Sequence, residues 1–393
     1  MAKDYVDSEE ACAILKIKPQ SLYAYVSRGL VRTVDAPGRA SLYARADLDV
    51  LRARSQARKG HGAVAASALR WGEPVLESAI TRLDEHDIYY RGFPLSQLIS
   101  NNVSFERVAE LMWSGMLPPV EPTWETSETK KRRHDSEYSV PVTYAELCAS
   151  LSQLNFSPAA VDDQTLSETL AVGRVVLSSC ADRSGDQMSC AASLVQRLLP
   201  KGRRPDAAEL LNAALVASAD FELSASTFAA RIAASTGASL LACLQAGLAA
   251  FSGPAHGAQI SSIEEMLLHL EHGTSIDSYV KRALAPGGNL PGFGQKLFPK
   301  GDPRAVALFE LIQPPPNASM KAIDELARAV FKRTGLKPNL ELALVILTRR
   351  LDLPRGSAFG LFATGRIAGW IAHVVEQRQQ GHVLRPRAKY TGR

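Results

Sequence analysis

The sequence predicts a mainly α-helical protein in two parts, a large helical body preceded by a small helix-turn-helix unit. The chain has 393 residues, more than a usual single domain. Hydrophobic residues make up 46% of it, which is enough to bury a sizeable core. After residue 60 strand signals are few, and apolar residues recur at helical spacing instead.

Two short helices are predicted at the start of the chain. Asp7 and Glu10 form a capping box before the first helix. Pro19 suits the first position of the second helix, which runs from Gln20 to Ser27. Two short helices with a tight connection are typical of a helix-turn-helix.

A two-stranded wing is predicted next, with strands over 30–34 and 41–43 around a turn at Pro37. A third helix over 47–52 completes the unit. This order of elements, over residues 4–56, resembles the winged helix-turn-helix of the MerR and excisionase type.

The charge of this unit is compatible with binding to DNA. Residues 1–60 hold 11 Lys and Arg against 7 Asp and Glu, so +4 of the chain's +5 lies in the first sixth. The alternative is a solvated basic face, or a small domain that docks to protein, because +4 is modest for a DNA-binding domain. The candidate DNA contacts are Lys18, Gln20, Ser21, Tyr23, Arg28 and Arg39.

The body is expected to follow a linker over 61–70, which belongs to a stretch rich in small and basic residues. A further exposed loop is predicted over 118–141. The apolar run 238–250 predicts a central buried helix and is too short for a membrane span. Helical windows cover 207–215, 228–250, 263–270, 304–312, 322–331, 342–347 and 359–377.

His256 is the histidine best placed for chemistry, in the Gly- and Pro-rich turn 252–258 after a long apolar stretch. An imidazole held at a helix end can donate or accept a proton near neutral pH. A single histidine in such a turn is more often structural, so the interpretation depends on residues elsewhere in the chain.

Two later segments supply those residues. In 291–296 a glycine loop offers backbone amides to an anion, and Arg304 follows as a partner for a carboxylate or phosphate. In 337–341 the carboxylate of Glu341 opens an apolar helix and is a candidate base. The alternatives are an ordinary turn and a glutamate that interacts with the helix dipole.

Six ordered segments of the chain together resemble the citrate synthase family. The resemblance implies an all-α, two-lobed homodimer that condenses an acyl-CoA, usually acetyl-CoA, with a 2-oxo acid such as oxaloacetate and releases CoA. It divides the body into a large domain over 71–256 and 350–393 and a small domain over 257–349, without a tightly bound cofactor. The six segments are YRGFPL, GPAHGA, PGFGQK with GDPRA, KPNLE, FATGRIAGWIAH and RPRAKYTG.

The resemblance also implies roles for individual residues. His256 matches the histidine that donates a hydrogen bond to the thioester carbonyl and stabilises the enol. Arg304, Arg366 and Arg385 match the arginines that hold the substrate carboxylates, and the last resembles one donated across the dimer interface. The residues expected to contact CoA are Pro291, Gly292, Phe293 and Gly294.

The chain departs from the family pattern at four positions. Gln295 stands for the histidine that polarises the keto carbonyl, and Glu341 stands for the catalytic aspartate. Ser218 and Phe221 occupy the positions of two family histidines that line the oxo-acid pocket. Asn339 is also expected to line this pocket. Glutamate keeps a carboxylate but adds one methylene, and glutamine donates a hydrogen bond but cannot carry a proton.

Two functions remain open on these residues. The first is a citrate synthase-family acyltransferase, slowed by its altered groups, with His256, Gln295 and Glu341 as catalytic residues. The rival is a transcription regulator whose body senses a CoA ester or a di- or tricarboxylate and controls DNA binding. An inactive scaffold is less attractive, because it gives the arginines no role.

The remaining features set broad limits. The five cysteines are scattered and odd in number, which predicts reduced thiols. The other histidines form no metal-ligand spacing, so we expect no metal. A cytoplasmic protein is expected, because no signal peptide precedes the basic unit.

Overall fold

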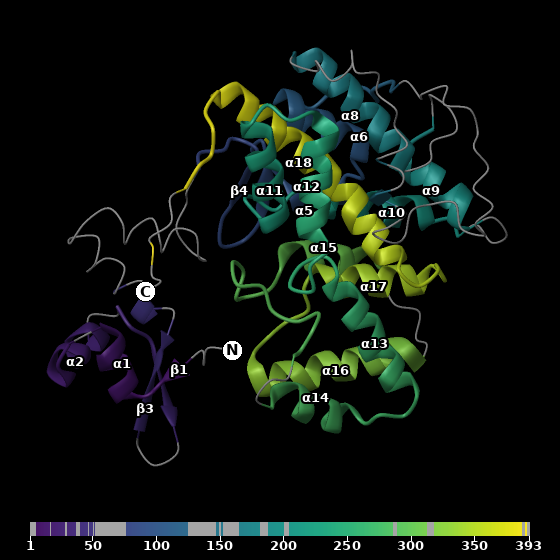
Figure 1. Ribbon diagram of the computed structural model, residues 1–393. Helices are drawn as coiled ribbons and strands as arrows, with labels where there is room; N and C mark the ends of the chain where they lie inside the picture. Colours follow the sequence, from purple (N-terminus) through teal and green to yellow (C-terminus); the bar gives the residue numbers. More distant parts are fainter. Residues whose placement is uncertain are drawn as a thin grey trace. The chain divides into compact units, whose positions relative to one another are not determined.

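The computed structural model describes residues 5–15, 17–27, 30–36, 40–45, 47–49, 51, 76–124, 147–148, 151, 165–180, 188–199, 204–285, 289–312, 318–386 and 390. The chain forms two compact units, Met1–Glu77 and Ser78–Arg393 (Figure 1). The predicted linker over 61–70, most of the predicted loop over 118–141, and Arg28 and Arg39 lie outside the described residues.

The N-terminal unit combines two short helices with a small antiparallel sheet in the order β1-β3-β2. The capping interaction of Asp7 is confirmed, because its Oδ1 accepts a hydrogen bond from the backbone N–H of Glu10 at 2.8 Å. Strand β1 was not predicted, since two residues carry too little pattern. The elements are β1 (Tyr5–Val6), α1 (Ser8–Leu15), α2 (Pro19–Ser27), β2 (Thr33–Ala36) and β3 (Ala40–Ala44).

This unit has a core of its own. Residues 47–49 and 51 are helical, as predicted. Asp47 in this stretch accepts hydrogen bonds from Nε and Nη2 of Arg32, both at 2.9 Å, and so joins the helical residues to the chain before β2. The buried hydrophobic cluster consists of Val6, Ala11, Leu22, Val31, Tyr43 and Leu48.

The body is built from helices around a long central one, with a three-stranded antiparallel sheet in the order β4-β5-β6 at its start. The strands are β4 (Thr81–Leu83), β5 (Ile88–Tyr90) and β6 (Phe93–Pro94). The helices are α5 (Leu95–Ser100), α6 (Phe105–Ser114), α8 (Leu166–Cys180), α9 (Cys190–Leu198), α10 (Ala207–Ser218), α11 (Ala225–Ser235), α12 (Leu240–Phe251), α13 (Gln259–Glu271), α14 (Ile276–Leu284), α15 (Pro303–Ile312), α16 (Ala318–Thr334), α17 (Leu340–Arg350) and α18 (Ser357–Gln380).

The helical windows predicted for the body fall on observed helices, with one error. The prediction of a single window over 228–250 is wrong, because this stretch contains parts of both α11 and α12. Gly237 adopts a positive φ of 80° after the end of α11. Ser239 then caps α12 by accepting a hydrogen bond from the backbone N–H of Ala242. Small apolar residues on both sides of this break disguise it in the sequence.

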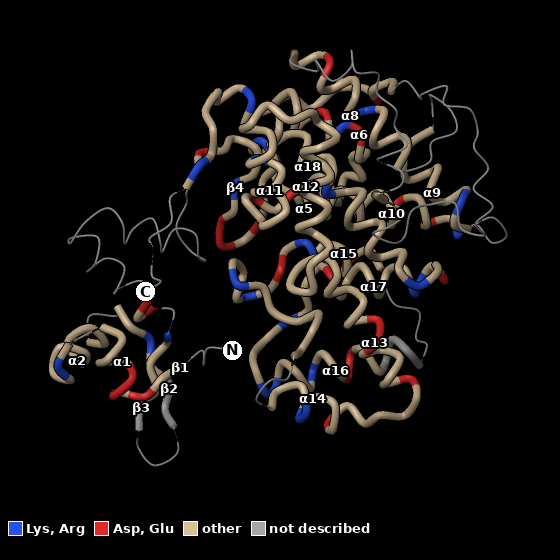
Figure 2. The backbone as a smooth tube through the Cα atoms, viewed as in Figure 1, with Lys and Arg blue, Asp and Glu red and all other residues tan. Residues whose placement is uncertain are grey.

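The prediction that 238–250 forms the central buried helix is also wrong. Helix α12 carries no charged residue (Figure 2), yet it buries only one face. The central helix is α18, drawn in yellow through the body in Figure 1, which packs against α8, α10, α11 and α12. By length and composition α18 could span a membrane, but its apolar window is entirely buried inside the protein.

Candidate active site

Four predicted site residues converge in the body, although they are far apart in sequence. His256 lies in the turn between α12 and α13, Arg304 and Glu341 lie in the first turns of α15 and α17, and Arg366 lies within α18. The charges of Arg304 and Arg366 act on the pKa of both His256 and Glu341. These four groups therefore lie within electrostatic reach of one another, and Arg385, the third arginine expected with them, is not among the charges that act on His256 or Glu341.

His256 is half-buried and neutral at physiological pH. Its ring packs against Phe251, with 4.9 Å between the ring centroids. Burial, followed by the positive charges of Arg366 and Arg304, lowers the pKa of His256 from 6.5 to about 4. A neutral imidazole keeps one N–H donor, and its position depends on the partner of the other nitrogen.

That partner is the buried hydroxyl of Ser226, which lies 2.8 Å from Nε2 of His256. The same hydroxyl accepts a hydrogen bond from the indole N–H of Trp370 at 3.3 Å. The hydroxyl also lies 3.2 Å from Oγ of Ser224. When the hydroxyl proton points to His256 Nε2, the ring proton resides on Nδ1, which makes that atom a hydrogen-bond donor.

The pKa of Glu341 is set by two opposing effects. Burial raises its pKa, while the charge of Arg304 acts in the opposite direction. Its Oε2 is shielded from solvent and has no hydrogen-bond partner in the described part of the chain. The neighbouring Asn339 caps α17, because its Oδ1 accepts a hydrogen bond from the backbone N–H of Leu342 at 3.2 Å. The predicted pocket-lining residue Asn339 thus has an identifiable structural task.

The guanidinium of Arg304 is held by hydrogen bonds from two of its nitrogens and by an aromatic ring against its face. Its Nε and Nη2 donate to the two oxygens of Asp302 at 2.9 and 2.8 Å. Its guanidinium lies 3.8 Å above the ring of Phe221. Burial acts to lower the pKa of Arg304, but Asp302 holds it above the ordinary value. Asp302 Oδ2 also accepts from the backbone N–H of Leu340 at 3.1 Å, which ties α15 to the start of α17.

Arg366 is held less completely. It is 1% exposed, and its Nη1 lies 3.5 Å from Oδ1 of the buried Asp220. Within the described residues its Nε and Nη1 have no hydrogen-bond partner. Burial lowers the pKa of Arg366, against the effect of the Asp220 charge.

The predicted glycine loop lies against the chain that leads into α17. The backbone N–H of Gly294 donates to the carbonyl of Lys337 at 2.8 Å, and that of Asn339 donates to the carbonyl of Gly292 at 3.0 Å. Gly292 has a φ of 85°, and a Cβ there would lie 3.1 Å from Cβ of Leu342. The half-buried Gln295 ends this loop, and its Oε1 accepts from the backbone N–H of Leu297 at 3.3 Å.

The other predicted residues differ in how they relate to this cluster. Phe221 contacts Arg304 and also Phe298, with 6.2 Å between the ring centroids. Ser218 is fully buried at the end of α10. Arg385 is exposed in the segment after α18, and the described residues that contact the cluster do not include it.

A cavity of about 320 Å³ between α13 and α14 shares only Pro291 with the predicted site. It is lined by Ser262, Glu265, Met266, His269, Tyr279, Arg282, Ala283, Asn289 and Pro291. Among the described residues, no group of three or more His, Cys, Asp or Glu side chains could hold a metal ion.

Comparison with known proteins identifies the family of the body. The family model for the C-terminal domain of citrate synthase matches residues 68–387. The chain belongs to the citrate synthase family. It is 29% identical over 328 residues to putative citrate synthase 2 of Mycobacterium tuberculosis, covering 77% of this chain and 86% of that protein. It is 26% identical to citrate synthase 2 of Bacillus subtilis, covering 80% of this chain and 93% of that protein.

Solved citrate synthases have the same fold as the body. The crystal structure of citrate synthase from Thermotoga maritima matches with a TM-score of 0.66 and 26% identity, covering 82% of this chain and 94% of that one. Citrate synthase of Thermoplasma acidophilum, solved with carboxymethyl coenzyme A and oxaloacetate, has a TM-score of 0.66, 20% identity and coverage of 81% and 94%. These comparisons support an enzyme with a citrate synthase-type condensation.

Sequence reasoning missed the residues that support the named ones. Ser226, Asp220 and Asp302 hold His256, Arg366 and Arg304, as described above. Asp302 had a usable signal, since an acidic residue two positions before an arginine at a helix start can bind it. Ser226 and Asp220 had none, because their partners are 30 or more residues away in the sequence.

Proposed function

We propose that this protein is an acyltransferase that condenses an acyl-CoA, acetyl-CoA or a close analogue, with a 2-oxo acid such as oxaloacetate. The product is citrate or an analogue, with free CoA. The observation that carries the proposal is the convergence of a neutral imidazole, a buried carboxylate with an unpartnered oxygen and two guanidinium groups in one family-typical body.

In this proposal Glu341 removes a proton from the α carbon of the acyl thioester. His256 donates its Nδ1 hydrogen bond to the thioester carbonyl oxygen and stabilises the enol as it forms. The nucleophilic α carbon attacks the keto carbon of the 2-oxo acid, whose oxygen accepts a hydrogen bond from Gln295. Because Gln295 cannot supply a proton, the new alkoxide takes one from water and becomes the hydroxyl of the product. Water then adds to the thioester carbonyl and the carbon–sulfur bond breaks, which leaves a carboxylate on the product and releases CoA as the free thiol.

Carboxylate binding is assigned to Arg366 and Arg304, with Arg385 reaching the site of a second copy in a homodimer. The buried partners Asp302 and Phe221 leave Arg304 little freedom, so Arg366 is the arginine best able to gain hydrogen bonds from a ligand. Phe221 gives the oxo-acid pocket an apolar wall beside Arg304. This wall favours 2-oxo acids that carry a hydrocarbon side chain.

The CoA ester is assigned to the loop Pro291–Gly294. The positive φ angles of Gly292 and Gly294 favour glycine, and they turn the loop backbone against Leu342 and Leu336. The cavity that begins at Pro291 also contains Arg282, which suits an anionic part of the ligand.

The test is release of free thiol, followed with a thiol-reactive dye. Acetyl-CoA and propionyl-CoA are each supplied with oxaloacetate, pyruvate or 2-oxobutyrate, and products are identified by mass spectrometry. Thiol release should require both substrates and should disappear in Glu341→Gln. Absence of thiol release above background in every pair, from folded dimeric protein, would remove the proposal.

A second function is favoured by residues 1–60 of the N-terminal unit, which precede the family match that begins at residue 68. We propose that residues 1–60 form a winged helix-turn-helix that binds DNA. This is supported by the two short helices with their sheet and by the exposure of Lys18, Gln20, Ser21 and Tyr23 at or next to the start of α2.

A homodimeric body would bring two such units to a palindromic site. Binding to the promoter of its own operon should weaken with salt and change when oxaloacetate or acetyl-CoA is added. Equal affinity with and without these ligands argues against sensing, and no binding at low salt argues against the DNA-binding role itself.

A further inference from the structure

The ion pair between Arg366 and Asp220 is buried but incomplete. Asp220 is 0% exposed, and its Oδ1 faces Nη1 of Arg366 at 3.5 Å. Among the described residues, Oδ1 of Asp220 and both Nε and Nη1 of Arg366 have no hydrogen-bond partner. Buried polar atoms without partners are costly, so each one in a native fold calls for an explanation. A ligand carboxylate would complete the hydrogen bonds of Arg366.

The backbone around Arg366 is fixed by close packing. Gly365 and Gly369 flank Arg366 on α18 and face the end of α10. A Cβ on Gly365 would lie 2.6 Å from Cβ of Ser218, and one on Gly369 would lie 2.3 Å from the carbonyl oxygen of Ala219. Only glycine allows this approach, which sets the Arg366 backbone directly beside Asp220.

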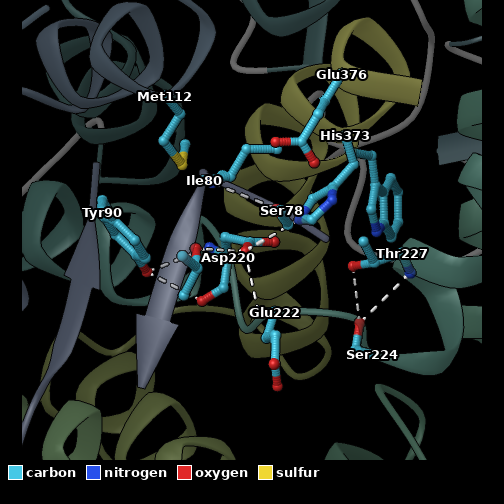
Figure 3. A network of polar contacts seen from close by, with 12 residues as sticks. Ser78, Ile80, Tyr90, Met112, Asp220, Glu222, Ser224, Thr227, His373 and Glu376 are labelled. Carbon is cyan, nitrogen blue, oxygen red and sulfur yellow. Dashed lines mark hydrogen bonds and ion pairs between the residues drawn. The ribbon is translucent and has the colours of Figure 1, made fainter. Parts of the chain in front are cut away.

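The carboxylate of Asp220 is oriented by donors on one side only. Its Oδ2 accepts from Thr81 Oγ1 at 2.6 Å, from the backbone N–H of Glu222 at 3.0 Å and from His373 Nε2 at 3.3 Å. Its backbone N–H and carbonyl both bond to the hydroxyl of Tyr90 (Figure 3). With Oδ2 saturated, Oδ1 is left to face Arg366.

His373 can donate to Asp220 because Arg231 fixes its tautomer. Nη1 of Arg231 lies 3.1 Å from Nδ1 of His373. A guanidinium only donates, so Nδ1 accepts and the ring proton resides on Nε2. Nε2 is the atom that faces Asp220. Arg231 therefore donates to His373, and His373 donates to Asp220.

Arg231 also holds the end of α18. It is 0% exposed and bonds to Glu376 Oε2 at 2.6 Å and to Gln377 Oε1 at 3.0 Å. The amide of Gln377 in turn donates to the carbonyl of His382 at 3.2 Å, shortly before Arg385. The same buried guanidinium therefore supports both the Asp220 site and the segment that carries Arg385.

We propose that Asp220 is the positioning residue for Arg366 in binding of the 2-oxo acid, and that Arg231 and His373 keep Asp220 in place. The inference rests on the proposed function and identifies how its carboxylate site is built. The negative charge of Asp220 balances the positive charge of Arg366 on one side of the guanidinium. The N–H groups of Arg366 that have no hydrogen-bond partner are then left for the ligand carboxylate.

The first test is Asp220→Asn, which keeps the size of the side chain and removes its charge. The KM for oxaloacetate should rise about 30-fold, because removing one charge of a buried ion pair leaves the other charge uncompensated. The KM for acetyl-CoA should stay within about twofold of wild type. A fall in kcat with an unchanged KM for oxaloacetate would overturn the proposal.

The second test compares two replacements of His373. His373→Gln keeps an N–H donor near the position of Nε2, whereas His373→Leu removes it. The leucine variant should resemble Asp220→Asn, and the glutamine variant should recover most of the wild-type KM for oxaloacetate. Equal effects of the two replacements would show that His373 acts only as packing.

A matched control is Glu110→Gln, which removes the charge of another buried carboxylate, one bound by Arg174 and Trp124. This variant should lower the melting temperature without raising the KM for oxaloacetate. Calorimetric titration of oxaloacetate alone separates the two proposals. If wild type binds oxaloacetate but releases no thiol, the proposed reaction fails and the role of Asp220 is still measured as a loss of affinity. Equal affinity of wild type and Asp220→Asn contradicts the role.

Discussion

The two walls of the candidate site are built in different ways. The wall formed by α10 and α18 is fixed by buried side-chain hydrogen bonds around Asp220 and by glycines that bring the two helices together. The wall formed by the loop 291–301 and the start of α17 is fixed largely by backbone hydrogen bonds, such as Gly294 to Lys337. Its exception is Asp302, which binds Arg304 and the start of α17.

This difference teaches where the site tolerates change. Replacing a member of the α10–α18 network leaves buried partners unsatisfied, which costs about 1–3 kcal/mol for each group. Gln295 and Glu341, two departures from the family pattern, lie on the other wall, where few side-chain partners depend on them. The other two departures, Ser218 and Phe221, lie at or just after the end of α10. On that wall the hydrogen-bonded Asp220 is retained between them.

The largest effect is expected from Glu341→Gln, which removes the base from the less constrained wall. Thiol release should fall about 10²–10⁴-fold, the usual contribution of a general base. Binding of oxaloacetate, measured by calorimetry, should be preserved. Glu341→Asp, which shortens the side chain by one methylene, should lose on the order of a hundredfold through misplacement alone. If Glu341→Gln keeps near-normal turnover, another group is the base.

A large effect on stability is expected from His256, in the turn between α12 and α13. Its pKa is about 4 in the folded chain against 6.5 ordinarily, so the unfolded chain binds more protons between these pH values. Stability is therefore fully present above pH 6.5 and is lost as pH falls toward 4, by about 3 kcal/mol. In urea unfolding, His256→Gln should flatten this part of the pH profile. Parallel profiles for variant and wild type would contradict the assignment.

The packing of the α10–α18 wall is tested by Gly369→Ala. A Cβ there would lie 2.7 Å from Asp220 Oδ1 and still closer to the backbone of Ala219. Forcing a methyl group into such a contact should lower the free energy of unfolding by about 1–3 kcal/mol and raise the KM for oxaloacetate. Gly253→Ala is the stability control, because a Cβ there meets its nearest atom at an ordinary 3.5 Å. Equal stabilities of the two variants would show that the close packing carries no strain.

Much of this arrangement was predictable from the sequence. Helix positions followed from apolar periodicity, as α15 and α17 show, and the site residues followed from the order of short motifs. The break between α11 and α12 was missed, because its residues are as small and apolar as those of the helices it separates. Helix α18 was not recognised as central, since burial on all sides depends on neighbours that periodicity cannot reveal.

The network behind Arg366 could not be predicted for a different reason. Asp220, His373 and Arg231 are meaningful only through contacts between residues about 140–150 positions apart. The tautomer of His373 depends on which of its nitrogens meets a guanidinium, and no local pattern encodes that. Sequence motifs identified the groups proposed to touch substrate, whereas coordinates were needed for the groups that hold them.

The smallest effect is expected from Gln295→His, which restores the family residue on the less constrained wall. Because the Gln295 side chain accepts its hydrogen bond from the nearby backbone of Leu297, the replacement removes no partner from a buried side chain in the described part of the chain. An imidazole can offer the keto oxygen a stronger donor than an amide, so kcat should rise by about tenfold. The same replacement should leave the KM for acetyl-CoA unchanged. A fall in kcat would mean that this wall has been rebuilt around glutamine, and that it is as constrained as the α10–α18 wall.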